Sequence, residues 1–172
     1  MLEEASDNES EAQSQDDGAL SIMLLRTPAR VPLSELHPSS IHIFKLWQTF
    51  LENVNPLTKI LHTPTVQPQI LEAMGDLPKI GKELEALMFS IYCIALVSLR
   101  AGEVEKSFGE SKKRLLSRCR RGAQLALSNA SFLKTSNLVI LQAFMLYIVS
   151  SAPFRFKITT HAVSLVVYAS IL

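Results

Sequence analysis

The segment from residue 84 to residue 99 is apolar on nearly every face, and it constrains the fold more than any other part of the chain. Its length and its Ala, Leu and Met content favour a helix over a strand, and a helix without a polar face packs on several sides. Three apolar runs, 86–99, 138–149 and 162–172, are each shorter than the roughly 20 residues that a membrane-spanning helix needs. The sequence therefore predicts an all-α fold around a central helix at 82–101. Membrane association remains an alternative, mainly because of the C-terminal run.

The charges are distributed unevenly along the chain. Residues 1–20 hold seven acids and no base, whereas the remaining residues hold nine acids and seventeen bases, which gives net charges of −7 and +8. The acidic segment has almost no apolar residue to bury, so we expect residues 1–20 to be a disordered tail. Residues 21–38 contain Pro28, Pro32 and Pro38, and because proline breaks helices we expect a connector there.

Caps, prolines and apolar periodicity predict a helical domain of about five helices in residues 39–151. Besides the central helix, the expected helices are 39–53, 66–74, 103–130 and 137–151, with a short helical turn at 57–61. The 103–130 helix could instead begin at Ser107, which stands three residues before Glu110 as in a capping box. Pro68 is expected in the first turn of its helix, where its missing N–H has no partner to lose.

The helix at 39–53 carries aromatic residues that we interpret as core and not as a ligand site. Trp47, Phe44 and Phe50 lie close together in the sequence, and we expect them to pack in the core. The apolar face of this helix is expected to hold the residues that recur at steps of three and four, namely Ile41, Phe44, Trp47, Leu51 and Val54.

The sequence offers no pattern typical of a catalytic or metal site. The six glycines are scattered, so no phosphate-binding loop is predicted. The four histidines, His37, His42, His62 and His161, form no pair at helical spacing, and Cys93 and Cys119 lack nearby metal ligands, so we expect two buried, reduced thiols. No nucleophile stands in a catalytic context. We therefore expect no catalytic, cofactor-binding or metal-binding residue, and no enzyme.

Six bases gather within ten residues and form a possible basic patch. The residues are Lys112, Lys113, Arg114, Arg118, Arg120 and Arg121. They can form the solvated face of an amphipathic helix, or they can contact phosphate or act as a nuclear import signal. Lys112 does not fit the first interpretation, because the helical periodicity directs it toward the apolar side.

Several motifs occur together in the first half of the domain. They are His37-Pro38, a helix centred on Trp47 that ends at Asn53, then Asn55-Pro56, and then His62 and Pro64 with one residue between them. Similarity extends through 84–92 and 109–111 to 141–144. This combination resembles the opening of the fungal-specific transcription factor domain, the middle homology region of fungal zinc-cluster transcription regulators. The resemblance covers residues 36–150.

The resemblance implies a helical regulatory domain of a nuclear RNA polymerase II transcription regulator. In that family a six-cysteine cluster with two zinc ions contacts DNA, and this sequence has no counterpart, so we expect no DNA-binding residue and no zinc here. The residues of the motifs are expected to be structural: His37, Pro38, Trp47, Asn53, Asn55, Pro56, His62 and Pro64.

The resemblance also implies that the domain is partial. Residues 152–172 do not resemble the family's continuation, so we expect truncation at both ends, a non-matching C-terminal tail and uncovered apolar helix faces. Protein partners are then expected, either a second copy or a related regulator, with DNA reached only indirectly. A helical interaction protein that pairs with another regulator, or a small membrane-associated protein, remains an alternative function.

Overall fold

The polypeptide between Pro32 and Ser151 folds into helices that are joined by short connections. The computed structural model describes residues 32–134 and 136–151. The expected acidic tail (1–20), most of the expected connector (21–38) and the expected C-terminal tail (152–172) lie outside the described residues. Within these, Pro32 precedes a short 3-10 helix, η1 (Leu33–Glu35), and so part of the connector is helical.

The all-α fold is confirmed, because the described residues contain helices and no strand. They form seven α-helices instead of about five. These are α2 (Ser40–Asn53), α3 (Asn55–Thr58), α4 (Thr63–Ala73), α5 (Lys82–Ser98), α6 (Ala101–Phe108), α7 (Lys112–Asn129) and α8 (Leu138–Ser151). Two further 3-10 helices, η2 (Leu77–Lys79) and η3 (Phe132–Lys134), lie in connections.

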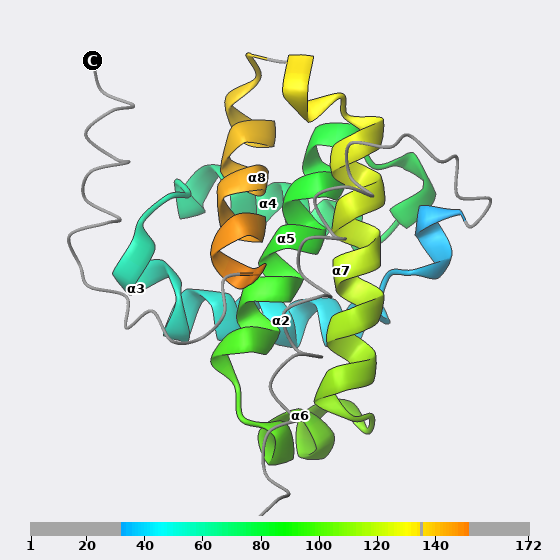
Figure 1. The fold of residues 1–172 in the computed structure, drawn as a ribbon, viewed down its shortest axis with the longest axis vertical. Coiled ribbons are helices and arrows are strands. Elements are labelled where there is room, and N and C mark those ends of the chain that lie inside the picture. Colours follow the sequence, from blue (N-terminus) through cyan, green and yellow to red (C-terminus); the bar gives the residue numbers. More distant parts are fainter. Residues whose placement is uncertain (1–31, 135, 152–172) are drawn as a thin grey trace, which may run out of the picture. The chain divides into compact units, whose positions relative to one another are not determined.

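Helix α5 is the centre of this helical unit, as the sequence predicted. Every residue from 86 to 96 is buried. Helices α7, α8 and α2 each pack against it, and Figure 1 shows α5 lying between α7 and α8, with α2 crossing behind. A helix surrounded in this way needs apolar side chains on all faces, which explains the unbroken apolar run.

The helix expected at 103–130 is two helices, α6 and α7, which corrects the prediction. Gly109 separates them in a left-handed conformation with a φ of 71°, and its N–H donates to the carbonyl oxygen of Glu105 at 3.0 Å. A glycine adopts this conformation readily and ends the helix. The expected Ser107–Glu110 capping box is replaced by Glu103, whose Oε2 accepts from the backbone N–H of Arg100 at 2.6 Å.

The buried face of α2 differs from the predicted face. Trp47 and Phe50 are buried and stack with their ring centroids 5.6 Å apart, as expected. Phe44 and Ile41, however, are 44% and 71% exposed. Both faces of α2 carry apolar residues at helical spacing, and packing against α5 selects the face that holds Ile43, Leu46, Trp47 and Phe50.

Helix α4 begins three residues earlier than predicted. It starts at Thr63, so that Pro64 occupies the first turn and Pro68 lies inside the helix, beyond the first turn where it was expected. Pro68 is exposed on the solvent side. The short turn that was predicted at 57–61 is α3, which includes Pro56 and ends before Lys59, a residue with a φ of 47°.

Candidate functional site

The six bases of the predicted patch divide into two groups of three. Lys112, Arg118 and Arg120 make contacts within the protein, whereas the other three are exposed: Lys113, Arg114 and Arg121. Arg118 holds Glu110 through two hydrogen bonds of 2.8 and 3.4 Å. Arg120 donates to the carbonyl oxygen of Ser150 at 3.1 Å and so joins α7 to the end of α8.

Lys112 points toward the end of α5 and not toward solvent. Its Nζ donates to the carbonyl oxygen of Val97 at 3.2 Å and also to that of Leu99. The last carbonyls of a helix have no partner within the helix and carry partial negative charge, so an ammonium group stabilises them. Partial burial lowers the pKa of Lys112, Glu103 opposes this effect, and Arg120 adds to it. The apparent misfit in the sequence is therefore a structural cap.

The three exposed bases share an open hollow beside the first half of α7. Its volume is about 510 Å³, and its lining consists of Leu36, Ser111, Lys113, Arg114, Ser117, Arg118 and Arg121. Leu36 follows η1, which packs against α7. Sequence reasoning found the bases but missed Leu36, Ser111 and Ser117. Ser117 could have been found, because it stands four residues after Lys113 and so lies on the same helical face.

The motif residue His37 lies at the start of the helical unit and contacts α5. Its ring is buried, with its centroid 4.2 Å from that of Phe89. Its Nδ1 lies 3.4 Å from the hydroxyl of Tyr92, and its Nε2 lies 3.6 Å from Oε1 of Glu85. The neighbouring Pro38 is buried as well. These contacts hold the chain that precedes α2 against the central helix.

Apart from Trp47, which is buried within α2, the remaining motif residues lie at the ends of α2, α3 and α4. Asn53 donates from Nδ2 to Oγ of Ser98 at 3.1 Å, and Asn55 donates to Oγ1 of Thr63 at 3.3 Å. His62 precedes α4, and its Nδ1 lies 2.7 Å from Oγ1 of Thr65. The first two contacts each join two helices, and the third lies within the first turn of α4.

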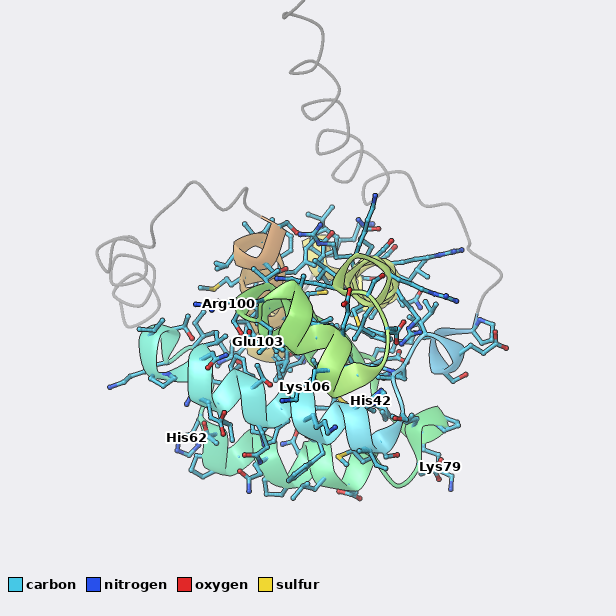
Figure 2. All side chains as sticks on the ribbon, turned by 90° about the horizontal axis from the view of Figure 1, so that it is seen from below. His42, His62, Lys79, Arg100, Glu103 and Lys106 are labelled. Atoms are coloured by element: carbon cyan, nitrogen blue, oxygen red, sulfur yellow. The ribbon has the colours of Figure 1, made fainter. Side chains whose placement is uncertain are left out.

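The histidines are not brought together. Figure 2 shows His42 beside the C-terminal end of α6, which lies against α2, and His62 well away from it. The His42 ring is 5.2 Å from that of Phe108. Among residues 32–134 and 136–151, no group of three or more His, Cys, Asp or Glu residues is arranged to hold a metal ion.

Cys93 on α5 and Cys119 on α7 are buried free thiols, as predicted. Burial raises the pKa of Cys93, and it raises the pKa of Cys119 to about 12. Burial likewise raises the pKa of the neighbouring Tyr92 hydroxyl. A thiol reacts as the thiolate, so these environments suppress nucleophilic chemistry.

In the part of the chain that the structure describes, no helix is both long enough and apolar enough to cross a membrane.

Known proteins with similar sequences are fungal transcription regulators. The chain is 48% identical over 123 residues to transcriptional regulator AacuB of Aspergillus aculeatus and 49% identical over 125 residues to transcriptional regulator nsrM of Aspergillus novofumigatus. It is 48% identical over 118 residues to aurofusarin cluster transcription factor aurR2 of Gibberella zeae. These matches cover 69–73% of this chain but only 17–18% of each relative.

A more distant relative carries the name of the zinc-cluster class. The C6 finger domain transcription factor nscR of Arthroderma otae is 30% identical over 138 residues, which are 78% of this chain and 20% of that protein. No family model matches the chain, so the fungal-specific domain indicated by the motifs stays a prediction. No solved structure matches. The chain is thus homologous to fungal transcription regulators, and it spans less than a fifth of the length of the first three relatives.

Proposed function

We propose that residues 39–151 are a regulatory, non-DNA-contacting part of a fungal RNA polymerase II transcription factor that acts in the nucleus. The identity of 45–49% to four fungal transcription regulators, over 67–73% of this chain, carries the proposal. One of these relatives is named for the aurofusarin cluster and another for pyriculol and pyriculariol biosynthesis. Their names support control of a biosynthetic pathway as the role of the whole regulator.

The use of the basic residues on α7 supports a role other than DNA contact. Lys112, Arg118 and Arg120 bind groups of the protein itself, which leaves three exposed bases on this helix. Phosphate contacts from Lys and Arg supply much of the affinity of proteins for DNA, and a protein can make about six to ten of them. The 172-residue chain holds two cysteines, and both are buried in the helical core. We therefore assign DNA recognition to a zinc cluster that lies outside these residues.

A segment exchange tests this function. In aurR2 of Gibberella zeae, the matched segment is replaced by residues 36–150 of this chain, and transcripts of the aurofusarin cluster are measured. We expect transcription to be retained and the chimaera to be nuclear. A second chimaera with Leu46→Asp, which places a charge at a fully buried position, should lose activity. An abundant, nuclear but inactive first chimaera would contradict the proposal, as would sequence-specific, salt-resistant DNA binding by the 172-residue chain alone.

We further propose that α8 contacts another polypeptide through its exposed side. Leu138, Leu141 and Ile148 are 62%, 42% and 41% exposed, and they lie within one arc of a helix that contains no charged residue. Exposed apolar patches are typical of protein interaction sites. A second copy of the chain or a related regulator is the expected partner.

Sedimentation equilibrium of the 172-residue chain tests the α8 contact. We expect self-association that weakens in the double variant Leu141→Lys/Ile148→Lys. The control is Leu57→Lys/Leu71→Lys, because these leucines are also exposed, at 65% and 44%, but lie on α3 and α4. Equal behaviour of the two variants would exclude self-association through α8, and co-sedimentation with a full-length relative would then test the second kind of partner.

A further inference from the structure

We propose that the hollow beside α7 binds a small phosphorylated organic molecule, with its phosphate held by Lys113, Arg114 and Arg121. The inference rests on the geometry of α7 and not on the proposed transcriptional role. The hollow is open to solvent, has a volume of about 510 Å³ and is lined by four bases in total. Its occupation by a phosphate would explain why exposed bases of one sign gather here.

Within residues 32–134 and 136–151, the three exposed bases form no ion pair. Glu110 stands two residues before α7, and both of its oxygens accept hydrogen bonds from Arg118. The ion pairs of the described residues involve neither Lys113 nor Arg114 nor Arg121. In the part of the chain that the structure describes, no ion pair neutralises the charge of these three bases, and a dianion would be attracted to them.

Hydrogen-bond donors complete the site. Ser111 precedes α7, but its side chain does not accept a hydrogen bond from the first N–H groups of this helix. The amino end of a helix attracts anions through these N–H groups. The hydroxyl of Ser117 and the planar guanidinium groups of Arg114 and Arg121 add donors that suit the several oxygens of a phosphate.

The shape of the hollow favours a compact anion over a nucleic acid. At 1.5 Å per residue, the bases from Lys113 to Arg121 span about 12 Å of the helix. They line one concavity, whereas a duplex is bound through phosphates distributed along its length. Leu36 adds an apolar surface at the edge that suits the carbon skeleton of the ligand.

Titration of the ¹⁵N-labelled 172-residue chain with inorganic phosphate and with phenyl phosphate tests the proposal. At constant ionic strength maintained with chloride, we expect saturable shifts of the amide signals of residues 112–114. Because Leu36 offers an apolar contact, phenyl phosphate should bind more tightly than inorganic phosphate. No saturable shift with either probe would overturn the proposal.

Two double variants that lose the same charge distinguish specific binding in the hollow from general electrostatic attraction. Arg114→Gln/Arg121→Gln should weaken phenyl phosphate binding at least about tenfold, because it removes two charge-assisted contacts. Lys82→Gln/Lys106→Gln removes the same charge at exposed positions on α5 and α6 and should leave the affinity within about twofold.

Circular dichroism verifies that both double variants remain folded. Equal weakening by the two variants would mean non-specific attraction and would overturn the site. A short DNA duplex that binds the chain more tightly than phenyl phosphate, and that loses binding in Arg114→Gln/Arg121→Gln, would replace the proposal with a nucleic-acid surface.

Discussion

Gly122 of α7 lies directly against the ring of Phe89 on α5. A Cβ atom added at Gly122 would overlap three ring carbons of Phe89, at distances well below van der Waals contact, and the Phe89 ring is itself fully buried. The close approach of these two helices therefore depends on the absence of a side chain at position 122. Glycine in the middle of a helix is unfavourable by itself, so packing explains its presence here.

Replacement of this glycine should destabilise the fold. Gly122→Ala gains up to about 1 kcal/mol of helix propensity but forces the two helices apart, and overpacking typically costs about 1–3 kcal/mol. We expect a net loss of about 1–2 kcal/mol in urea unfolding, followed by the fluorescence of the single tryptophan, Trp47. The control is Gly102→Ala in α6, where an added Cβ meets nothing within 4 Å. It should be neutral or stabilising, and an equal loss in both variants would contradict the packing explanation.

Lys112 and Lys113 are adjacent bases that should behave differently. Lys112→Met removes the donor to the carbonyl oxygens of Val97 and Leu99, which should lower the free energy of unfolding by about 1–2 kcal/mol. Lys113→Met removes an equal charge from an exposed side chain and should change the free energy of unfolding by less than about 0.5 kcal/mol. Thermal unfolding of both variants measures the difference. Equal effects would mean that net charge, and not the cap of α5, determines stability here.

The two motif histidines, His37 and His62, should also contribute differently to stability. His37→Ala removes a buried ring from Phe89 and leaves the hydroxyl of Tyr92 without its partner, so we expect a loss of about 2–3 kcal/mol. His62→Ala removes the exposed residue before α4 and its contact with Thr65, for which we expect about 0.5–1 kcal/mol. Chemical unfolding of the two variants gives the comparison. A larger loss for His62→Ala would refute the anchoring role of His37.

The helical fold and its centre were predictable because they depend on local patterns. The unbroken apolar run of α5 indicates a helix packed on all sides, and Cys93 and Cys119 lie within apolar helical patterns that predict burial. The break between α6 and α7 was harder to predict, because Gly109 lies between two segments that share a helical pattern. Its left-handed conformation is seen only in the folded chain.

The candidate site was predictable in composition but not in arrangement. The six bases of α7 are evident in the sequence, but their partners are distant: the end of α5 for Lys112 and Ser150 for Arg120. Leu36 contributes to the hollow from a different element altogether. Likewise, two apolar faces compete on α2, and only packing against α5 leaves Phe44 exposed. Which face of a helix is buried depends on tertiary contacts, and the spacing of apolar residues in the sequence carries no information about these contacts.

The buried thiol of Cys119 should make the stability depend on alkaline pH. Its pKa in the folded protein is about 12, whereas an ordinary thiol has a value of 9.0. The unfolded chain therefore loses this proton first, so the stabilisation is complete below pH 9 and is lost as the pH rises toward 12. By linkage the full effect is on the order of 4 kcal/mol. Burial also raises the pKa of Cys93 and Tyr92, and this too makes the stability fall as the pH rises. The lowered pKa of Lys112 has the opposite effect on the stability.

Urea unfolding between pH 8 and pH 11 measures the contribution of Cys119 through the variant Cys119→Ala. This change removes the titrating group, so the decline of stability with pH should become shallower even though the variant is less stable at pH 8. The control is Leu115→Ala, which also truncates a fully buried side chain of α7 but retains every ionisable group. It should decline as steeply as the unmodified chain. If Cys119→Ala keeps the full slope as well, the thiol gains access to solvent in the folded protein, and its burial does not control the alkaline limit of stability.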